Sequence, residues 1–144
     1  MPTHGGSDIN KYLSQEEKNT LKLEFAYQGQ SFGMIGGYCE EGFPLYYANE
    51  DMAALLGYES VEELAAAIGG RVVNTIHPDD MAQVENDLGG RFYEGMTYET
   101  TYRMLRRDGS WFWTVDEGKV VRAEDGRLAI LSVCTDMSDF LHRQ

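Results

Sequence analysis

The sequence predicts an α+β domain in which short helices and one longer helix pack across one face of a five-stranded antiparallel sheet. Three observations predict this fold. Two strand-like segments open the domain, glycine-punctuated short helices fill its middle, and a run rich in Thr, Tyr, Trp, Val and Ile closes it. The order contains no internal repeat and lacks the strand-helix alternation of a parallel α/β fold.

The composition indicates one soluble domain. The chain has 144 residues, 42% of them hydrophobic, and no apolar run approaches the roughly 20 residues of a membrane-spanning helix. Its start is polar throughout and lacks the pattern of a secretion signal, so we expect a cytoplasmic protein without a membrane segment. The net charge of −12 would repel a phosphate backbone, which argues against nucleic-acid binding.

Residues 1–31 are predicted to form an N-terminal tail and a flanking helix. The first 13 residues show no periodicity. Ser14 to Glu17 then form a capping box, and Leu21 and Phe25 continue at helical spacing. This pattern predicts a helix over about residues 14–29.

The next segments predict a hairpin and two short helices. Strands over Phe32–Tyr38 and residues 44–49 flank a turn at residues 40–43. Asn49 is a suitable N-cap for a helix that Gly57 ends in a left-handed conformation. A second capping box, Ser60 to Glu63, opens a helix that stops at residues 69–70.

A longer helix is predicted over residues 77–95, with apolar residues at spacings of three and four. His77 would cap it and Pro78 would occupy its first turn, followed by Asp79 and Asp80, whose charges suit the helix dipole. The alternative is a metal site, or a small hydrolase or isomerase using His77, Asp79 and Asp80. Adjacent helical side chains do not face each other, so we predict no catalytic residue and no metal site.

The last third predicts three antiparallel strands in a meander. Asp108-Gly109 and Asp125-Gly126 are hairpin turns, because few residues other than glycine tolerate the positive φ that such turns require. With the first hairpin, these strands complete the five-stranded sheet.

Several stretches, in this order and spacing, resemble a PAS domain of the kind found in bacterial sensor kinases and cyclic-di-GMP enzymes. They are "LYYANEDMAALLGY", "IHPDD", "YETTYRMLRRDGSWFWTVDEGKVVRAEDGRL" and "VCTDMSD". The resemblance covers about residues 32–139, which we take as the domain, and leaves 140–144 as the start of an outgoing linker. It implies a pocket on the inner face of the sheet for a ligand or cofactor, and flanking helices that dimerise and pass a signal onward.

The resemblance also bears on signal relay and on cofactors. In the family, an Asp followed two residues later by Thr or Ser joins the last strand to the outgoing helix, and Asp136 and Ser138 occupy those positions. The Asn-Cys-Arg motif of flavin-binding light sensors is missing. Haem-binding members use a His on the long helix, where this chain has only His77 at the start. Flavin and haem are therefore both disfavoured, and the cofactor is left unknown.

Strand alternation nominates residues for the implied pocket. The candidates are Phe92 from the predicted longer helix, Tyr98, Tyr102 and Met104 on one strand, and Trp113 and Val115 on the next. The alternative reading of this aromatic stripe is an ordinary core. Buried tyrosine hydroxyls need hydrogen-bond partners, and a ligand could supply one.

The two cysteines allow reduced thiols or a redox pair. Cys39 and Cys134 are 95 positions apart and lack metal-site spacing. The strand order implied by the resemblance makes the first and last strands neighbours, which would place Cys39 and Cys134 on adjoining strands.

We therefore expect a non-catalytic sensory module of two-component or cyclic-di-GMP signalling. It would bind a small molecule or a partner, form a homodimer through flanking helices, and act on an effector outside this chain. The alternative is a purely structural dimerisation or protein-interaction domain without a ligand.

Overall fold

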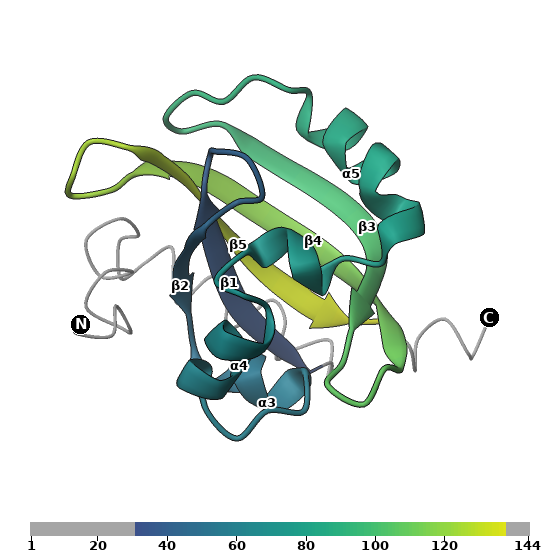
Figure 1. Cartoon of the computed structure of the whole chain (residues 1–144). Coiled ribbons are helices and arrows are strands. Elements are labelled where there is room, and N and C mark those ends of the chain that lie inside the picture. Colours follow the sequence, from purple (N-terminus) through teal and green to yellow (C-terminus); the bar gives the residue numbers. More distant parts are fainter. Residues whose placement is uncertain (1–30, 138–144) are drawn as a thin grey trace.

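The computed structural model describes residues 31–137, which form one five-stranded antiparallel sheet with short helices on one face (Figure 1). The strands are β1 (Phe32–Tyr38), β2 (Leu45–Ala48), β3 (Thr97–Leu105), β4 (Trp111–Arg122) and β5 (Leu128–Asp136). Their order across the sheet is β2-β1-β5-β4-β3, so β5 is the central strand. This confirms the predicted α+β sheet, whereas the helix predicted over 14–29 lies outside the described residues.

The hairpin turns lie where the sequence predicted them. Gly109, between β3 and β4, has φ 88°, and Gly126, between β4 and β5, has φ 91°. These angles fall in the left-handed region, which glycine adopts without steric cost. The Asp-Gly pairs therefore fix where the three long strands reverse.

The first two helices, α3 (Glu50–Leu55) and α4 (Val61–Ala67), begin at the predicted caps. Oδ1 of Asn49 accepts a hydrogen bond from the Met52 N–H at 2.9 Å and another from the Met34 N–H of β1 at 3.1 Å. Oγ of Ser60 accepts the Glu63 N–H at 3.1 Å. The Asn49 side chain thus starts α3 and also ties it to β1.

Helix α3 packs against the backbone of β1. A Cβ placed on Gly33 would lie 2.5 Å from Cα of Met52, closer than non-bonded atoms approach. Only glycine at this position permits the contact, so the Gly-rich character of β1 has a packing cause. The helices α3 and α4 lie over β1 on the same side of the sheet (Figure 1).

The predicted longer helix is shorter than expected. The chain forms the 3-10 turn η1 (Val72–Thr75), then the 3-10 turn η2 (Pro78–Asp80), and then the helix α5 (Met81–Leu88). Gly89 has φ 80° and ends α5 in the left-handed conformation. Phe92 therefore lies in the loop before β3. The prediction that the helix continues to residue 95, which used the helical spacing of Phe92 from Leu88, was wrong.

Helix α5 and η2 cover the edge strand β3. The Arg103 N–H donates to Oδ2 of Asp80 at 2.8 Å, and the His77 N–H donates to the Arg103 carbonyl at 2.9 Å. Nε2 of Gln83 donates to the Thr101 carbonyl at 2.9 Å. These bonds occupy backbone groups that an edge strand would otherwise offer to another chain.

The main core lies between the helices and the sheet face that they cover, here called the inner face. Its largest fully buried side chains include Ile35, Met52, Leu56, Leu64, Met104 and Phe112. On β5 the residues of the opposite, outer face are buried as well, as Val133 and Thr135 show. The central strand is thus buried on both sides, and groups on it are shielded from water.

Candidate functional site

The inner face carries a polar group of side chains within the apolar core. Strand pairing aligns them in rows that run across β3, β4 and β5. The rows are Tyr102, Thr114 and Asp136; Thr100, Asp116 and Cys134; and Tyr98, Gly118 and Ser132. We call the five side chains Tyr98, Tyr102, Asp116, Ser132 and Cys134 the buried polar cluster.

Asp116 is the central member of this cluster. The Tyr102 hydroxyl donates to its Oδ2 at 2.9 Å, whereas its Oδ1 is buried and has no hydrogen-bond partner among residues 31–137. Burial raises the pKa of Asp116 to about 6, although polar interactions with Ser132, Tyr102 and Cys134, in that order, oppose the shift. A buried carboxyl with one unused oxygen is costly, because desolvation is not fully compensated.

The other cluster members keep their protons at neutral pH. Burial, followed by the charge of Asp116, raises the pKa of Tyr98, Tyr102 and Cys134 well above their usual ranges. The Cys134 sulfur lies 3.9 Å from the Tyr102 oxygen. Asp116 is therefore surrounded by neutral hydroxyl and thiol groups.

Tyr98 spans three strands. Its oxygen lies 2.5 Å from Oγ of Ser132 on β5, although Tyr98 itself belongs to β3. The phenol ring reaches Ser132 by passing over Gly118 of β4, where an added Cβ would overlap the phenol oxygen. The absent side chain of Gly118 thus creates the slot that Tyr98 fills.

The structure brings part of the predicted pocket set together. Tyr98, Tyr102 and Met104 lie on the inner face, and Phe92 packs against the same core from its loop. Trp113 and Val115 lie on the outer face, since they pair with Arg103 and Thr101. The expected grouping therefore fails on β4, where the inner-face residues are Phe112, Thr114, Asp116 and Gly118.

On the outer face, Trp113 belongs to an aromatic and cationic group at the end of the sheet. The rings of Trp111 and Trp113 meet edge to face with centroids 5.9 Å apart. The Arg103 guanidinium lies 5.4 Å from one ring centroid and 5.6 Å from the other. Trp111 is 44% exposed, so this group forms part of the surface.

Asp136, predicted for signal relay, lies at the end of β5. Its carboxylate is 3.2 Å from Nη2 of Arg106, and its N–H donates to the Ser31 carbonyl at 2.8 Å. The following Met137 N–H donates to the Trp113 carbonyl at 2.8 Å. The chain therefore enters and leaves the described domain at the same place. Ser138, the second predicted relay residue, lies outside the described residues.

A direct Cys39–Cys134 pair is inconsistent with the structure. β1 and β5 are neighbours, as expected, but they are antiparallel and Cys134 pairs with Gly33. The Cys39 N–H instead bonds to the Leu128 carbonyl, so the Cα atoms of the two cysteines lie about 20 Å apart along the strands. A disulfide needs Cα atoms within about 7 Å. Both cysteines are free, and burial raises the pKa of Cys39 to about 11.

The residues 77–80 form a helix start, as predicted for the capping reading. Nδ1 of His77 accepts the Asp79 N–H at 3.1 Å. Asp80 has a role that the sequence did not reveal, because its carboxylate accepts hydrogen bonds from Nε of Arg103 at 3.0 Å and from Nη2 at 2.7 Å. The Arg103 guanidinium lowers the pKa of Asp80. Within residues 31–137 no group of three or more His, Cys, Asp or Glu side chains is placed to hold a metal ion.

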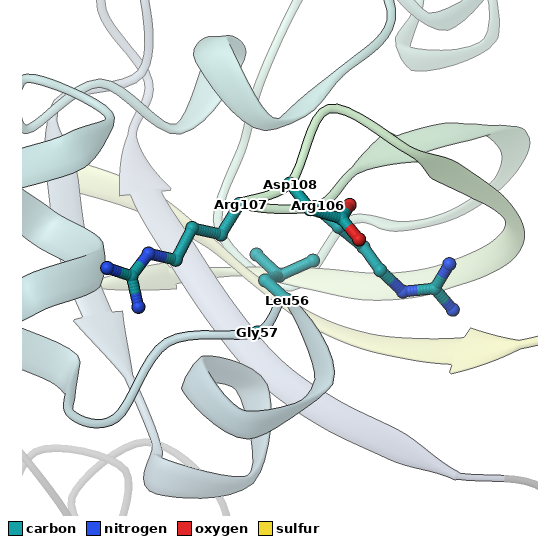
Figure 2. A pocket seen from close by; sticks show the side chains of 5 residues that line it. All are labelled: Leu56, Gly57, Arg106, Arg107 and Asp108. Carbon is teal, nitrogen blue, oxygen red and sulfur yellow. The ribbon is translucent and has the colours of Figure 1, made fainter.

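A surface pocket of about 290 Å³ lies between the end of α3 and the β3–β4 turn. Figure 2 shows Leu56 at its centre, with the side chains of Arg106 and Arg107 extending to opposite sides. Arg106 is bound to Asp136, and Arg107 is 3.3 Å from Glu63. Both guanidinium groups of this pocket are already neutralised, which makes it a poor anion site.

The comparisons with known proteins agree with this architecture. Residues 45–134, more than half of the chain, match the family model described as the PAS fold. The chain belongs to the PAS family. A search of curated proteins found no significant match.

Three solved structures resemble this PAS domain in fold. A sensory box histidine kinase/response regulator from Burkholderia thailandensis is 23% identical with a TM-score of 0.58, over 85% of this chain and 88% of that one. A PAS domain from Colwellia psychrerythraea is 18% identical with a TM-score of 0.56, over 85% and 98%. The PAS domain of an HTR-like protein from Haloarcula marismortui is 19% identical with a TM-score of 0.56, over 83% and 98%.

Membership of the PAS family says which kind of module the described residues form. It is a PAS module of the kind found in sensory signalling proteins, and such a domain is non-catalytic in itself. Across residues 31–137, no helix has the length and apolar character needed to cross a membrane.

Two members of the buried polar cluster, Asp116 and Ser132, were missed by sequence reasoning, and so was the neighbouring Gly118. Ser132 lies between two apolar residues, Asp116 is followed by a second acidic residue, and Gly118 interrupts β4. A glycine inside a strand marks a place where another group approaches closely, which here is Tyr98. The glycine inside β4 could therefore have indicated the row of Tyr98, Gly118 and Ser132.

Proposed function

We propose that this PAS domain is a sensory module whose interior holds a small ligand around Asp116. Its state passes along β5 and the flanking segments to an effector outside the chain, such as a kinase or a cyclic-di-GMP enzyme. The observation that carries this proposal is the buried, unpartnered Oδ1 of Asp116. A core selected only for stability gains nothing from a half-satisfied carboxyl, whereas a binding site uses one to recognise its ligand.

The relay part of the proposal is supported by the position of β5. Asp116 pairs with Cys134, and Asp136 at the strand end lies two residues further on. Its ion pair with Arg106 and its backbone bond to Ser31 join the exit of the domain to its entry. A shift of β5 at Asp116 would therefore move both connections together.

Native mass spectrometry of freshly purified protein tests this proposal, because one spectrum reports subunit number and any bound molecule. We expect a dimer that carries an extra mass, and loss of that mass in Asp116→Leu, in which an apolar side chain of similar size replaces the carboxyl. A bound molecule retained by Asp116→Leu would show that the ligand lies elsewhere.

The relay is tested with Asp136→Ala. The Arg106–Asp136 pair is partly exposed, so its loss should change the free energy of unfolding by no more than about 1 kcal/mol. The variant should nevertheless lose any effect of ligand on the dimer equilibrium. Ligand-dependent dimerisation that survives in Asp136→Ala would contradict the proposed route.

The second candidate function is a structural dimerisation domain without a ligand. It is favoured by the exposed aromatic group of Trp111 and Trp113 on the outer face, since exposed tryptophan is typical of interfaces. This candidate predicts a dimer without extra mass that Trp111→Ala weakens. The sensory proposal predicts that Trp111→Ala leaves ligand binding unchanged.

A further inference from the structure

Tyr98 occupies a slot on the inner face that has the shape of a small binding site. Its floor is the Gly118 backbone, where even a Cβ would overlap the phenol oxygen. Its far end is Ser132, 2.5 Å from that oxygen. The slot is therefore as wide as one aromatic ring and ends at a hydrogen-bonding group.

Tyr98 is only half-buried as a whole, although its hydroxyl lies deep in the core. It packs against the rim of the main core together with Phe43 and Phe92. The rings of Phe43 and Phe92 meet edge to face, 6.0 Å between centroids. Because Tyr98 lies at this partly exposed edge of the core, rotation of its side chain would empty the slot without unfolding β3.

Asp116 determines the chemistry of the emptied slot. It lies two residues from Gly118 on the same face of β4, and its Oδ1 needs a donor. Its charge is felt at Tyr98, whose pKa it raises. No Lys, Arg or His side chain within residues 31–137 forms an ion pair with Asp116, so an anionic ligand would meet repulsion without compensation.

We propose that the Tyr98 slot is the ligand site of this domain, and that its ligand is a flat aromatic molecule of one or two rings with an N–H or O–H donor and no negative charge. The ring takes the place of the Tyr98 phenol above Gly118, and the donor satisfies Oδ1 of Asp116. This inference rests on the proposed sensory function and specifies its ligand class. When no ligand is bound, the Tyr98 ring fills the slot. Its displacement by the ligand is the conformational signal.

The test uses three probes that share one ring and differ in a single group: 4-methylaniline, toluene and 4-methylbenzoate, titrated at pH 7.5 by NMR. In Tyr98→Ala, which vacates the slot, 4-methylaniline should bind about tenfold tighter than toluene, the value of one hydrogen bond. 4-Methylbenzoate should bind more weakly than either. Tyr98→Phe, which keeps the ring in place, is the matched control and should bind all three more weakly than Tyr98→Ala.

Two further measurements distinguish a natural binding site from a cavity that the Tyr98→Ala substitution creates. Adding Asp116→Leu to Tyr98→Ala should abolish the advantage of 4-methylaniline over toluene. In the wild type, 4-methylaniline should still bind, less tightly than in Tyr98→Ala, and should shift the Tyr98 ring signals as that ring leaves the slot. Should Tyr98→Ala not fold, Tyr98→Val serves instead, because its β-branched side chain suits a strand.

The outcomes divide as follows. The inference is overturned if the three probes bind equally or if 4-methylbenzoate binds best. It is also overturned if the advantage of 4-methylaniline persists without Asp116, or if only Tyr98→Ala binds the probes. If the wild type binds or retains an anionic or non-aromatic molecule, the sensory function stands and the ligand class is wrong. If the wild type carries no molecule and binds no probe, both proposals fail.

Discussion

The Tyr102 hydroxyl donates a 2.9 Å hydrogen bond to Oδ2 of Asp116, while Oδ1 of the same carboxyl is buried without a partner among the described residues. The two residues lie on the inner face of adjacent strands, Tyr102 on the edge strand β3 and Asp116 on β4, which neighbours the central strand β5. Tyr102 and the nearby Ser132 and Cys134 favour the ionised carboxyl, but Oδ1 itself accepts no hydrogen bond from the described residues. The balance between its charged and neutral forms therefore depends on what reaches Oδ1, whether a proton or a ligand donor.

The first prediction concerns pH. The pKa of Asp116 is raised from 3.8 to about 6 in the folded protein by burial. Between about pH 4 and pH 6 the folded state thus holds more protons than the unfolded state, and the free energy of unfolding falls as pH rises through this interval. The full loss is about 2–3 kcal/mol, from 1.36 kcal/mol per pKa unit.

Urea denaturation of Asp116→Asn from pH 4.5 to 8 checks this prediction. The variant should lose the decline and be at least as stable as the wild type at pH 7, since its amide can still accept from Tyr102. Glu99→Gln, which neutralises an exposed carboxylate on β3, should retain the wild-type decline. An unchanged pH profile in Asp116→Asn would contradict the assignment. Asp80 has the opposite effect on the pH dependence. Because its pKa is lowered in the folded protein, its contribution to the free energy of unfolding is lost only as the pH falls.

The second prediction concerns the tie between η2 and β3. Asp80 accepts three hydrogen bonds from Arg103, at 2.7, 2.8 and 3.0 Å. Asp80→Ala leaves the backbone N–H and the guanidinium without these acceptors, and should lower the free energy of unfolding by about 1–3 kcal/mol. Asp79→Ala, at the exposed neighbouring position, should change it by less than about 0.5 kcal/mol. Equal effects of the two substitutions in thermal or urea denaturation would show that the tie contributes nothing.

Much of the sheet was predictable because its signals are local. The Asp-Gly turns and the caps at Asn49 and Ser60 depend on residues within one turn, and all lie where expected. The end of α5 was also encoded locally, at Gly89, but the apolar spacing to Phe92 outweighed it. Local chemistry thus defines where elements start and stop better than periodicity does.

The site was harder to predict because its assembly depends on three strands. Burial alternates over residues 111–117 of β4, but the strand alternation used for the prediction placed Trp113 and Val115 in the interior in place of Thr114 and Asp116. The turn at Gly109 sets the phase between β3 and β4, and it places the polar residues inside. When the more apolar face of a strand is assigned to the core, the assignment fails wherever the core is polar, as it is around Asp116.

The third prediction tests the packing of Tyr98 on Gly118. Gly118→Ala would place a methyl group where the phenol lies, and should destabilise the protein by about 2 kcal/mol, as overpacking typically does. In a Tyr98→Ala background the same substitution should cost much less, because the obstructing ring is gone. A double-mutant cycle from urea denaturation measures this coupling. Additive effects would show that Gly118 and Tyr98 do not share the slot.

The fourth prediction separates a cap from a metal ligand at His77. Nδ1 of His77 accepts the Asp79 N–H, so His77→Ala should lower the free energy of unfolding by about 1 kcal/mol, a typical cost of losing an N-cap. His77→Asp should restore most of this stability, since a carboxylate caps the same N–H and suits the helix dipole. Zn²⁺ should leave the Tm of the wild type unchanged, because the cap uses the single lone pair of the neutral imidazole. In addition, no group of three or more His, Cys, Asp or Glu side chains within residues 31–137 is placed to hold a metal. A Tm raised by Zn²⁺ in the wild type but not in His77→Asp would overturn the capping assignment.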